Sequence, residues 1–246
     1  MSNKIQAGQI EIGFFYFLYF KLEKMNSENH RIAVIAGSTG LVGHELLQLL
    51  QNDSTYDKVY CLVRKSSNLK HPRVTELVID FDRISESLSE IKSVDDIYCC
   101  LGTTIKTVGG SKEAFRKVDH DYPLALAKWG ESMNAKKLLV VSAMGADANS
   151  SIFYNKTKGE MENDISKLKI ESITFFRPSL LIGDRKENRP GEKIGIAIAK
   201  ALSFLFIGPL KNYKGIHVAK VAAAMLRASK QQVSGMAIVL SGEMNI

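Results

Sequence analysis

The sequence has few of the residues that form disulfide or metal scaffolds. Only three of its 246 residues are cysteines, and Cys61, Cys99 and Cys100 all lie in apolar runs typical of strands. Neighbours on a strand point to opposite faces, and an odd number of buried thiols fits a reducing compartment. The five histidines are far apart and have no metal-ligand spacing with a cysteine or carboxylate. We therefore expect no disulfide, no metal and a cytoplasmic location.

Long hydrophobic runs are also absent. Ile12 to Phe20 is a run of nine residues, too short to span a bilayer, and it lacks the basic start and cleavage site of a secretory signal. A polar stretch begins at Met25, just ahead of the first strand pattern. We expect residues 1–24 to be a leader outside the fold and residues 25–246 to form one domain. A peripheral membrane anchor is the alternative for the leader.

The charge pattern gives no sign of a nucleic-acid partner. The formal net charge is +7, but the basic residues are scattered and accompany no nucleic-acid-binding motif. Hydrophobic residues make up 45% of the chain and charged residues 24%, which is ordinary for a globular protein. The sequence shows no internal repeat and no low-complexity tract. A single large α/β domain fits this composition.

The stretch Ile32 to Gly43 combines an apolar run with three evenly spaced glycines. The run is typical of a parallel strand buried on both faces, and apolar residues at helical spacing follow it. A glycine turn between strand and helix lets backbone N–H groups approach a pyrophosphate at the helix N-terminus. An ordinary turn without a ligand is the alternative. We expect a dinucleotide to be bound by Gly37, Ser38, Thr39, Gly40, Leu41, Val42 and Gly43.

Two cations follow the second strand pattern and indicate the type of dinucleotide. Arg64 and Lys65 end the run Lys58 to Val63, and Arg64 lies 21 residues past Gly43. An acidic residue there would bind the ribose 2′-hydroxyl of NAD, whereas a basic one accommodates the 2′-phosphate of NADP. The sequence therefore favours NADP over NAD. The alternative is that both cations are merely solvated residues at a strand end.

Two further strand patterns end in residues that could contact the same ligand. Val74 to Ile79 is followed by a carboxylate and an aromatic residue that could border an adenine. Asp95 to Leu101 is followed by a glycine and two threonines, and ligands bind beyond the carboxyl ends of parallel strands. Plain polar turns are the alternative. The expected cofactor contacts here are Asp80, Phe81, Leu101, Gly102, Thr103 and Thr104.

The pattern around Ser142 predicts the chemistry. Ser142 ends the strand pattern Lys137 to Val141, and Tyr154 and Lys158 lie one turn apart on a predicted helix that begins twelve residues later. Lys158 would lower the pKa of Tyr154 toward neutral for general acid/base catalysis, and Ser142 would donate a hydrogen bond to a substrate carbonyl. A surface tyrosine with a snorkelling lysine is the alternative.

Together, the residues from Gly37 to Gly43, Arg64, Ser142, Tyr154 and Lys158 resemble an atypical short-chain dehydrogenase/reductase. Over about residues 31 to 230, five finer matches resemble the Tat-interacting oxidoreductase-like family and its bacterial relatives. They are Tyr98 to Thr104, Val118 to Tyr122, Lys158 to Glu160, Phe176 to Pro178 and Gly183 to Arg185.

The resemblance implies a Rossmann-type doubly wound parallel sheet with helices on both faces, and NADP bound by the glycine turn. It also implies a Ser-Tyr-Lys catalytic set and a Pro178 region close to the nicotinamide. The family does not specify a substrate. Because its animal members are discussed as regulators that act through protein partners, a binding module without turnover is an alternative to an enzyme.

The C-terminal part is expected to form a small substrate-side region. Arg185 and Arg189 could bind a carboxylate or phosphate, and the apolar stretch Ile194 to Leu210 predicts a lid or packing helix, with a subunit interface or bilayer contact as alternatives. The sequence thus predicts an NADP-dependent oxidoreductase for a small carbonyl or alcohol substrate. A nucleotide-sugar epimerase or dehydratase is the other enzymatic possibility, and the sequence leaves monomer and homodimer both open.

Overall fold

The computed structural model describes residues 31–183 and 215–245, which are built around one parallel sheet. Seven strands hydrogen-bond in the order β3-β2-β1-β4-β5-β6-β9, and every neighbouring pair is parallel. In chain order the strands are β1 (Arg31–Ala36), β2 (Tyr56–Val63), β3 (Val74–Val78), β4 (Asp96–Cys99), β5 (Lys137–Val141), β6 (Ser172–Arg177) and β9 (Gly235–Leu240).

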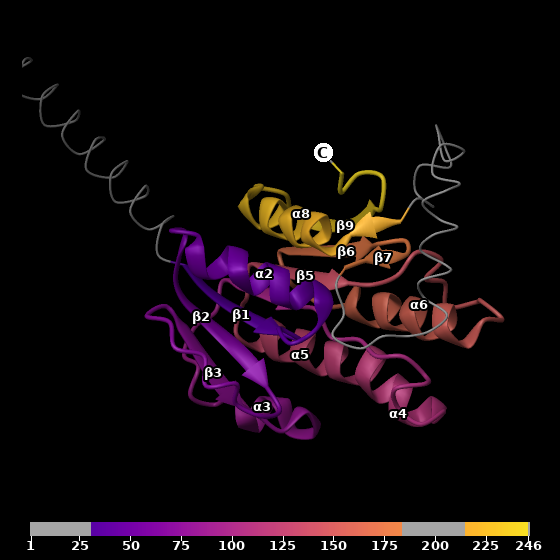
Figure 1. Ribbon diagram of the computed structural model, residues 1–246, viewed down its shortest axis with the longest axis horizontal. Helices are drawn as coiled ribbons and strands as arrows, with labels where there is room; N and C mark the ends of the chain where they lie inside the picture. Colours follow the sequence, from indigo (N-terminus) through magenta and orange to yellow (C-terminus); the bar gives the residue numbers. More distant parts are fainter. Residues whose placement is uncertain (1–30, 184–214, 246) are drawn as a thin grey trace, which may run out of the picture.

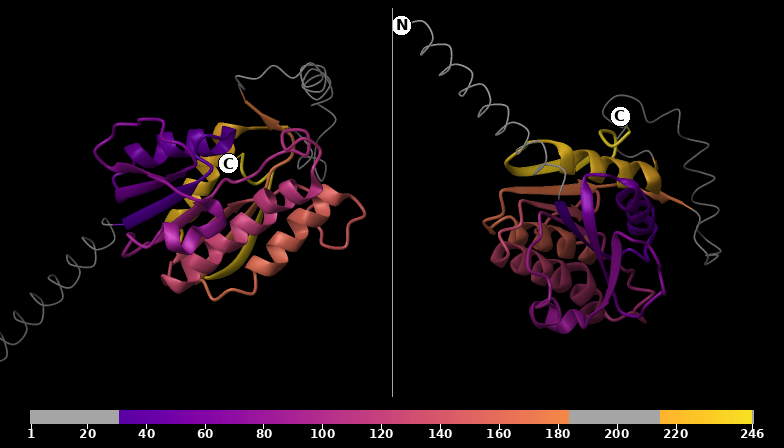
Figure 2. Two further views of the ribbon diagram at one scale, coloured as in Figure 1. Left: turned by 90° about the horizontal axis from the view of Figure 1, so that it is seen from below. Right: turned by 90° about the vertical axis from the view of Figure 1, so that its left-hand side faces the viewer.

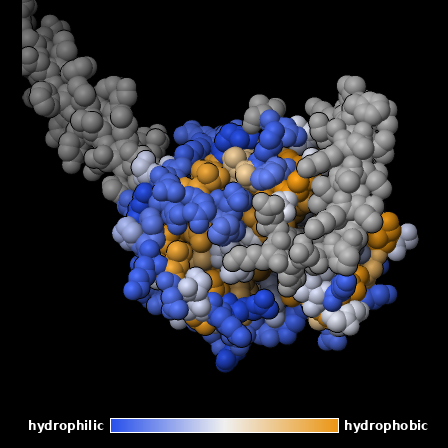
Figure 3. Space-filling view, viewed as in Figure 1, coloured by the Kyte–Doolittle hydropathy of each residue, from blue (hydrophilic) through white to orange (hydrophobic). Residues whose placement is uncertain are grey.

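Helices cover both faces of this sheet, as Figures 1 and 2 show. One face is packed by α2 (Leu41–Asn52) and α8 (Val218–Lys230), and the other by α3 (Ile84–Ser87), α5 (Tyr122–Ser132) and α6 (Phe153–Ile165). The shorter helical elements are η1 (Phe81–Arg83), α4 (Lys112–Arg116) and η2 (Lys117–Asp121). On the molecular face seen in Figure 3, hydrophilic residues dominate the described surface and hydrophobic ones are grouped toward the middle.

The strand order reverses between β1 and β4, and this reversal determines where a ligand can bind. The chain moves outward from β1 to β2 and β3, then returns to β4 on the other side of β1. The loops after β1 and β4 therefore leave the carboxyl edge of the sheet in opposite directions and leave a crevice between them. The central strands β1 and β4 are almost wholly buried, and apart from Arg31 and Asp96 at their amino ends their side chains are mostly apolar on both faces.

A π-helical turn interrupts the long helical segment that begins after Ser111. Ser111 caps its start by accepting a hydrogen bond from the backbone N–H of Ala114 at 3.0 Å, as expected of an N-cap serine. The chain then runs through α4, the π-helical η2 and α5 without a break. Such turns are frequent at functional sites. Here the π turn carries Asp119, a buried carboxylate that faces the site described below.

The predicted fold class is confirmed. The structure adds a small parallel pair that the sequence did not indicate, β7 (Leu181–Ile182) with β8 (Ile216–His217). No helix in the described part of the chain is long and apolar enough to cross a membrane. The expected leader, Arg185, Arg189 and the stretch Ile194 to Leu210 lie outside the described residues.

Candidate active site

The glycine turn after β1 forms a cradle that only glycine can build. Gly37 has a φ of +86°, and a Cβ there would lie 2.5 Å from the carbonyl oxygen of Cys100. A Cβ on Gly43 would lie 2.1 Å from the carbonyl oxygen of Gly37, so α2 begins in direct contact with the turn. Backbone N–H groups at the start of a helix packed in this way can approach a phosphate closely. The turn therefore fits the pyrophosphate of a dinucleotide.

Some of the other residues of the glycine turn lie on the surface and others lie in the core. Thr39 and Gly40 are exposed, whereas the side chain of Val42 belongs to the core beneath α2. Ser38 is buried and accepts a hydrogen bond from the thiol of Cys61 at 2.8 Å. Burial raises the pKa of the Cys61 thiol, so this cysteine stays protonated and supports the turn from β2.

Arg64 and Lys65 lie where the sequence predicts them, directly after β2 and on the same edge of the sheet as the glycine turn. Both are exposed. Within the described residues, neither forms an ion pair with a carboxylate. Two solvated cations beside a dinucleotide cradle fit a phosphate group.

Phe81, a predicted cofactor contact, also contributes to the core. Its ring is buried and packs against Tyr122, with 5.5 Å between ring centroids, because η1 turns the chain inward directly after β3. Asp80 caps η1 by accepting the backbone N–H of Asp82 at 3.0 Å, and it also pairs with Arg83. The contacts of Asp80 and Phe81 with an adenine stay predictions.

The loop after β4 lies between the glycine turn and the catalytic candidates. Its Cys100 carbonyl touches Gly37, and Gly102 lies over Asp119 and Lys158, so that a Cβ on Gly102 would be 3.4 Å from an Asp119 oxygen. The backbone N–H of Thr103 donates to Asp119 at 2.8 Å. The neighbouring loop residues are Leu101, which packs against the core, and Thr104, whose hydroxyl bonds Thr107.

Asp119 and Lys158 form a buried ion pair below this loop. The Nζ of Lys158 lies 2.8 Å from a carboxylate oxygen of Asp119, and the side chains are 3% and 1% exposed. Burial opposes the charge on Lys158, but Asp119 and then Tyr154 outweigh it, so the pKa of Lys158 lies above its ordinary value. Lys158 therefore remains a cation on the site side of α6, as the sequence predicts.

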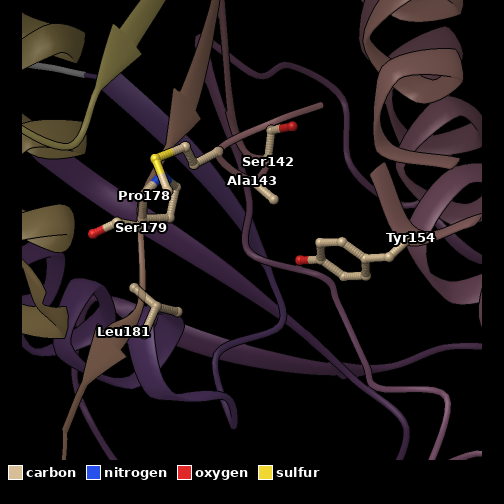
Figure 4. Close-up of a pocket in the computed structure, with 7 residues that line it drawn as sticks. Ser142, Ala143, Tyr154, Pro178, Ser179 and Leu181 are labelled. Carbon is tan, nitrogen blue, oxygen red and sulfur yellow. The ribbon is translucent and has the colours of Figure 1, made fainter. Parts of the chain in front are cut away.

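Tyr154 stands one turn before Lys158 and lines a cavity of about 180 Å³. Figure 4 shows its hydroxyl end pointing toward the other labelled residues of this cavity. Burial raises the pKa of the phenol, and Asp119 raises it too, while Lys158 lowers it less than burial raises it. The predicted fall of this pKa toward neutral is therefore wrong. The cavity is lined by Ser142, Ala143, Met144, Tyr154, Pro178, Ser179 and Leu181.

Ser142 lines the same cavity at the end of β5, but its proton has a different acceptor from the one predicted. Its hydroxyl donates to the carboxylate of Glu162, which lies two turns after Tyr154 on α6. Arg177, the last residue of β6, holds that carboxylate from the other side, with Nε 3.0 Å and 3.2 Å from its two oxygens. A hydroxyl has one proton, so in this arrangement Ser142 does not donate to a substrate carbonyl.

The structure thus brings Ser142, Tyr154 and Pro178 into one cavity with Lys158 directly behind it. Sequence reasoning missed three charged residues that surround this set. Asp119 lies in a run used only for family resemblance, and Arg177 precedes Pro178 in another. Glu162 lies eight residues past Tyr154, on the helix face that faces the sheet. The helical spacing between Tyr154 and Glu162 was the signal in the sequence that could have identified Glu162.

Comparison with known sequences identifies clear relatives. The HIM1 family model matches residues 47–206, which is more than half of the chain. HTATIP2 from Rattus norvegicus is 32% identical over 70% of this chain and 72% of that protein. The FMP52 proteins of Eremothecium gossypii and Candida glabrata are 34% and 32% identical, over 68% and 82% of this chain and 73% and 88% of theirs.

Solved structures share the fold at low sequence identity. UDP-N-acetylglucosamine 4-epimerase from Methanobrevibacter ruminantium superposes with a TM-score of 0.64 at 16% identity, over 86% of this chain and 77% of that chain. WbmH from Bordetella bronchiseptica, solved in complex with NAD⁺, gives a TM-score of 0.63 at 14% identity, over 87% and 76%. These likenesses confirm the Rossmann-type sheet with helices on both faces.

The names of the relatives overturn the predicted location. Both FMP52 proteins are named as mitochondrial, so the expectation of a cytoplasmic protein is wrong. The cysteine content indicates only that thiols stay reduced, and it does not distinguish one reducing compartment from another. The resemblance itself is confirmed, because the family model and relatives above 30% identity cover most of the chain. The chain belongs to the HIM1 family and is a relative of HTATIP2 and the FMP52 proteins.

Proposed function

We propose that this protein is an NADP-dependent oxidoreductase that interconverts a carbonyl and an alcohol in the cavity beside Tyr154. One observation carries the proposal: the Tyr154 phenol enters a cavity at the carboxyl ends of β5 and β6, with the buried cation of Lys158 one helical turn behind it. A phenol and an ammonium in this relation are suited to general acid/base chemistry. The structural neighbours that bind NAD support a nicotinamide cofactor.

The residues that would hold the cofactor lie along the carboxyl edge of the sheet. The glycine turn from Gly37 to Gly43 would bind the pyrophosphate, Arg64 and Lys65 the 2′-phosphate, and the loop Leu101 to Thr104 the middle of the molecule. Pro178 borders the cavity and would contact the nicotinamide. When bound, the nicotinamide supplies or accepts the hydride.

Tyr154 would act mainly as a proton donor. The raised pKa of its phenol keeps the proton in place at neutral pH, so Tyr154 can protonate the substrate oxygen as a carbonyl is reduced. Lys158 would limit the cost of the phenolate that remains, because the positive charge lies close to it. The protonated phenol is thus in the form that carbonyl reduction requires.

Replacement of Tyr154 tests the proposal. Tyr154→Phe removes the hydroxyl and keeps the ring, which packs against Phe115 with 5.7 Å between centroids. We expect NADPH affinity to change less than about threefold, and the rate of NADPH oxidation with aldehydes, ketones or quinones to fall by about 10²-fold or more. Tyr60→Phe, on β2, is the matched control. Unchanged turnover in Tyr154→Phe would remove this residue from the mechanism.

The cofactor preference has a separate test. Titration of the protein with NADPH and NADH should give the tighter binding to NADPH, because two cations can bind the 2′-phosphate. Arg64→Ala should reduce that preference by about tenfold, as expected for a lost charge-assisted hydrogen bond. Lys70→Ala is the control. Lys70 is also exposed, and its replacement removes one positive charge that does not directly follow β2. Equal affinities for both dinucleotides in the unaltered protein would refute the assignment.

A nucleotide-sugar epimerase or dehydratase is the second candidate, because the structural neighbours include a UDP-N-acetylglucosamine 4-epimerase and MoeE5 in complex with UDP-glucose and NAD. Such an enzyme returns the cofactor to its starting redox state at the end of each turnover. Incubation with NADP⁺ and UDP-glucose or UDP-N-acetylglucosamine, followed by product analysis and absorbance of the reduced nicotinamide, separates the two. A changed sugar without net NADPH formation would support the epimerase or dehydratase, whereas an oxidised sugar formed together with an equal amount of NADPH would support the oxidoreductase.

A further inference from the structure

The wall of the cavity behind Ser142 contains a buried carboxylate that the proposed reaction does not use. Glu162 projects from α6, and its side chain is 6% exposed. Arg177 reaches it from the end of β6, with Nη2 2.5 Å from Oε2 and Nε 3.0 Å from Oε1. Two elements that border the cavity are thus joined through this ion pair, directly behind the hydroxyl of Ser142.

The ion pair between Glu162 and Arg177 determines which residue is the donor in the hydrogen bond between Ser142 and Glu162. An arginine side chain has only donors and stays protonated in proteins, and the hydrogen bonds to Glu162 raise the pKa of Arg177 further. A carboxylate held by two guanidinium N–H groups accepts hydrogen bonds and has no proton to give. The contact between Ser142 and Oε1 of Glu162 therefore uses the Ser142 proton.

Only the lone pairs of Ser142 then remain for a molecule in the cavity. The residue is 4% exposed and still contributes to the cavity lining. Turning its proton into the cavity would take this hydrogen bond from a buried carboxylate oxygen and leave it only the one from Arg177 Nε, which is unfavourable for a buried charged acceptor. Toward a ligand, Ser142 is consequently an acceptor.

We propose that Glu162, held by Arg177, is a positioning residue that makes Ser142 a hydrogen-bond acceptor, so that the cavity selects ligands presenting a hydroxyl donor. This inference rests on the proposed function and specifies its substrate class. An alcohol can donate to Ser142 and accept from the Tyr154 phenol, whereas a carbonyl or an ether can only accept. The cavity thus binds the alcohol form with one hydrogen bond more than the carbonyl form.

A glutamine at position 162 should reverse this selection. Arg177 only donates, so it holds the amide oxygen at the place of Oε2, which lies within reach of both Nη2 and Nε at 2.5 Å and 3.2 Å. The amide nitrogen then takes the place of Oε1 opposite Ser142, and Nε gives up its 3.0 Å contact there. That nitrogen donates to the Ser142 oxygen, which frees the serine proton to point into the cavity. Glu162→Gln therefore turns Ser142 into a donor and favours ligands that only accept.

The test measures binding without turnover. Protein saturated with NADPH is titrated with cyclohexanol and with its methyl ether, methoxycyclohexane, and dissociation constants are obtained by ligand-observed NMR. Neither probe can be reduced at its oxygen-bearing carbon. The alcohol-to-ether ratio of affinities in Ser142→Ala serves as the baseline, because it includes the effect of the difference in size between the probes. The alcohol-to-ether ratio should be about tenfold or more above that baseline in the unaltered protein, and at or below it in Glu162→Gln.

Two results would overturn the inference: the same ratio in the unaltered protein and in Ser142→Ala, or an unaltered ratio in Glu162→Gln. Circular dichroism checks that each variant is folded, and if Glu162→Gln is not, the comparison with Ser142→Ala decides alone. Failure of NADPH to bind would instead count against the proposed function. The probe titrations are then repeated without nucleotide, because the contact between Ser142 and Glu162 lies entirely within the chain.

Discussion

Burial, Lys158 and Asp119 together determine how firmly Tyr154 holds its proton. Lys158 alone would stabilise the phenolate, but the carboxylate 2.8 Å away offsets its charge. The Coulombic effects on Tyr154 consequently oppose each other, and burial leaves the pKa raised. The residue pattern Tyr-x-x-x-Lys predicts the position of the cation correctly, but burial of the phenol, to which the missed Asp119 adds, reverses the predicted direction of the pKa change.

Asp119→Asn should move the pH dependence of carbonyl reduction. The substitution removes a negative charge that raises the pKa of Tyr154, so the phenol loses its proton at lower pH. Because reduction requires the protonated phenol, the fall in kcat at alkaline pH should begin at lower pH than in the unaltered protein. Asp121→Asn, on the same π turn but bonded to His120, is the control. Identical profiles for Asp119→Asn and the unaltered protein would contradict this role.

A second buried hydrogen-bond network joins the amino ends of the strands, at the edge of the sheet opposite the cavity. Asp96 begins β4 and accepts hydrogen bonds from Arg31 of β1 and Tyr56 of β2. The Tyr56 hydroxyl also reaches Ser229 near the end of α8 at 3.2 Å. The Nζ of Lys137, at the start of β5, donates to the Ser229 carbonyl at 2.7 Å. This network fastens α8 to the strands.

Folding stability should depend on the protonation of Asp96. Burial raises the pKa of this carboxyl to about 6 despite the nearby Arg31. Since the folded state binds the proton more tightly than the unfolded state, this contribution is complete below about pH 4 and is lost as the pH rises through about 6. The loss should amount to about 3 kcal/mol in the free energy of unfolding.

Urea unfolding between pH 4 and pH 8 measures this dependence. Asp96→Asn should be less stable at acidic pH and should lack the decrease near pH 6. Asp95→Asn changes the neighbouring carboxylate, which binds the Ile32 N–H and Lys136, and should keep most of that decrease. A decrease of equal size in Asp96→Asn and in the unaltered protein would show that other groups cause it.

The network that fastens α8 to the strands and the proposed active site lie at opposite edges of one sheet. At the amino edge, buried polar groups tie strands to α8, and at the carboxyl edge the loops after β1, β2, β4, β5 and β6 carry the proposed binding and catalytic residues. Helices on both faces hold the strands in register (Figure 1). The rigid sheet therefore places residues from distant segments of the chain in one crevice.

This arrangement explains which features could be predicted from the sequence. The strands, the glycine turn and the position of Tyr154 follow from local patterns, since apolar runs and helical spacing depend on neighbours in the chain. The partners of Lys158 and Ser142 do not, because Asp119 and Glu162 reach them only through the π turn and the packing of α6. The packing of Phe81 could not be predicted for the same reason, as it depends on the contact with Tyr122 from a distant segment.

A crystal structure of the protein with NADPH tests the central claim most directly. The account predicts that the pyrophosphate lies on the glycine turn from Gly37 to Gly43 and the adenosine phosphate beside Arg64. It also predicts that the nicotinamide ring lies in the cavity between Pro178 and the Tyr154 hydroxyl. A dinucleotide bound elsewhere, or a nicotinamide ring separated from Tyr154 by other side chains, would contradict it.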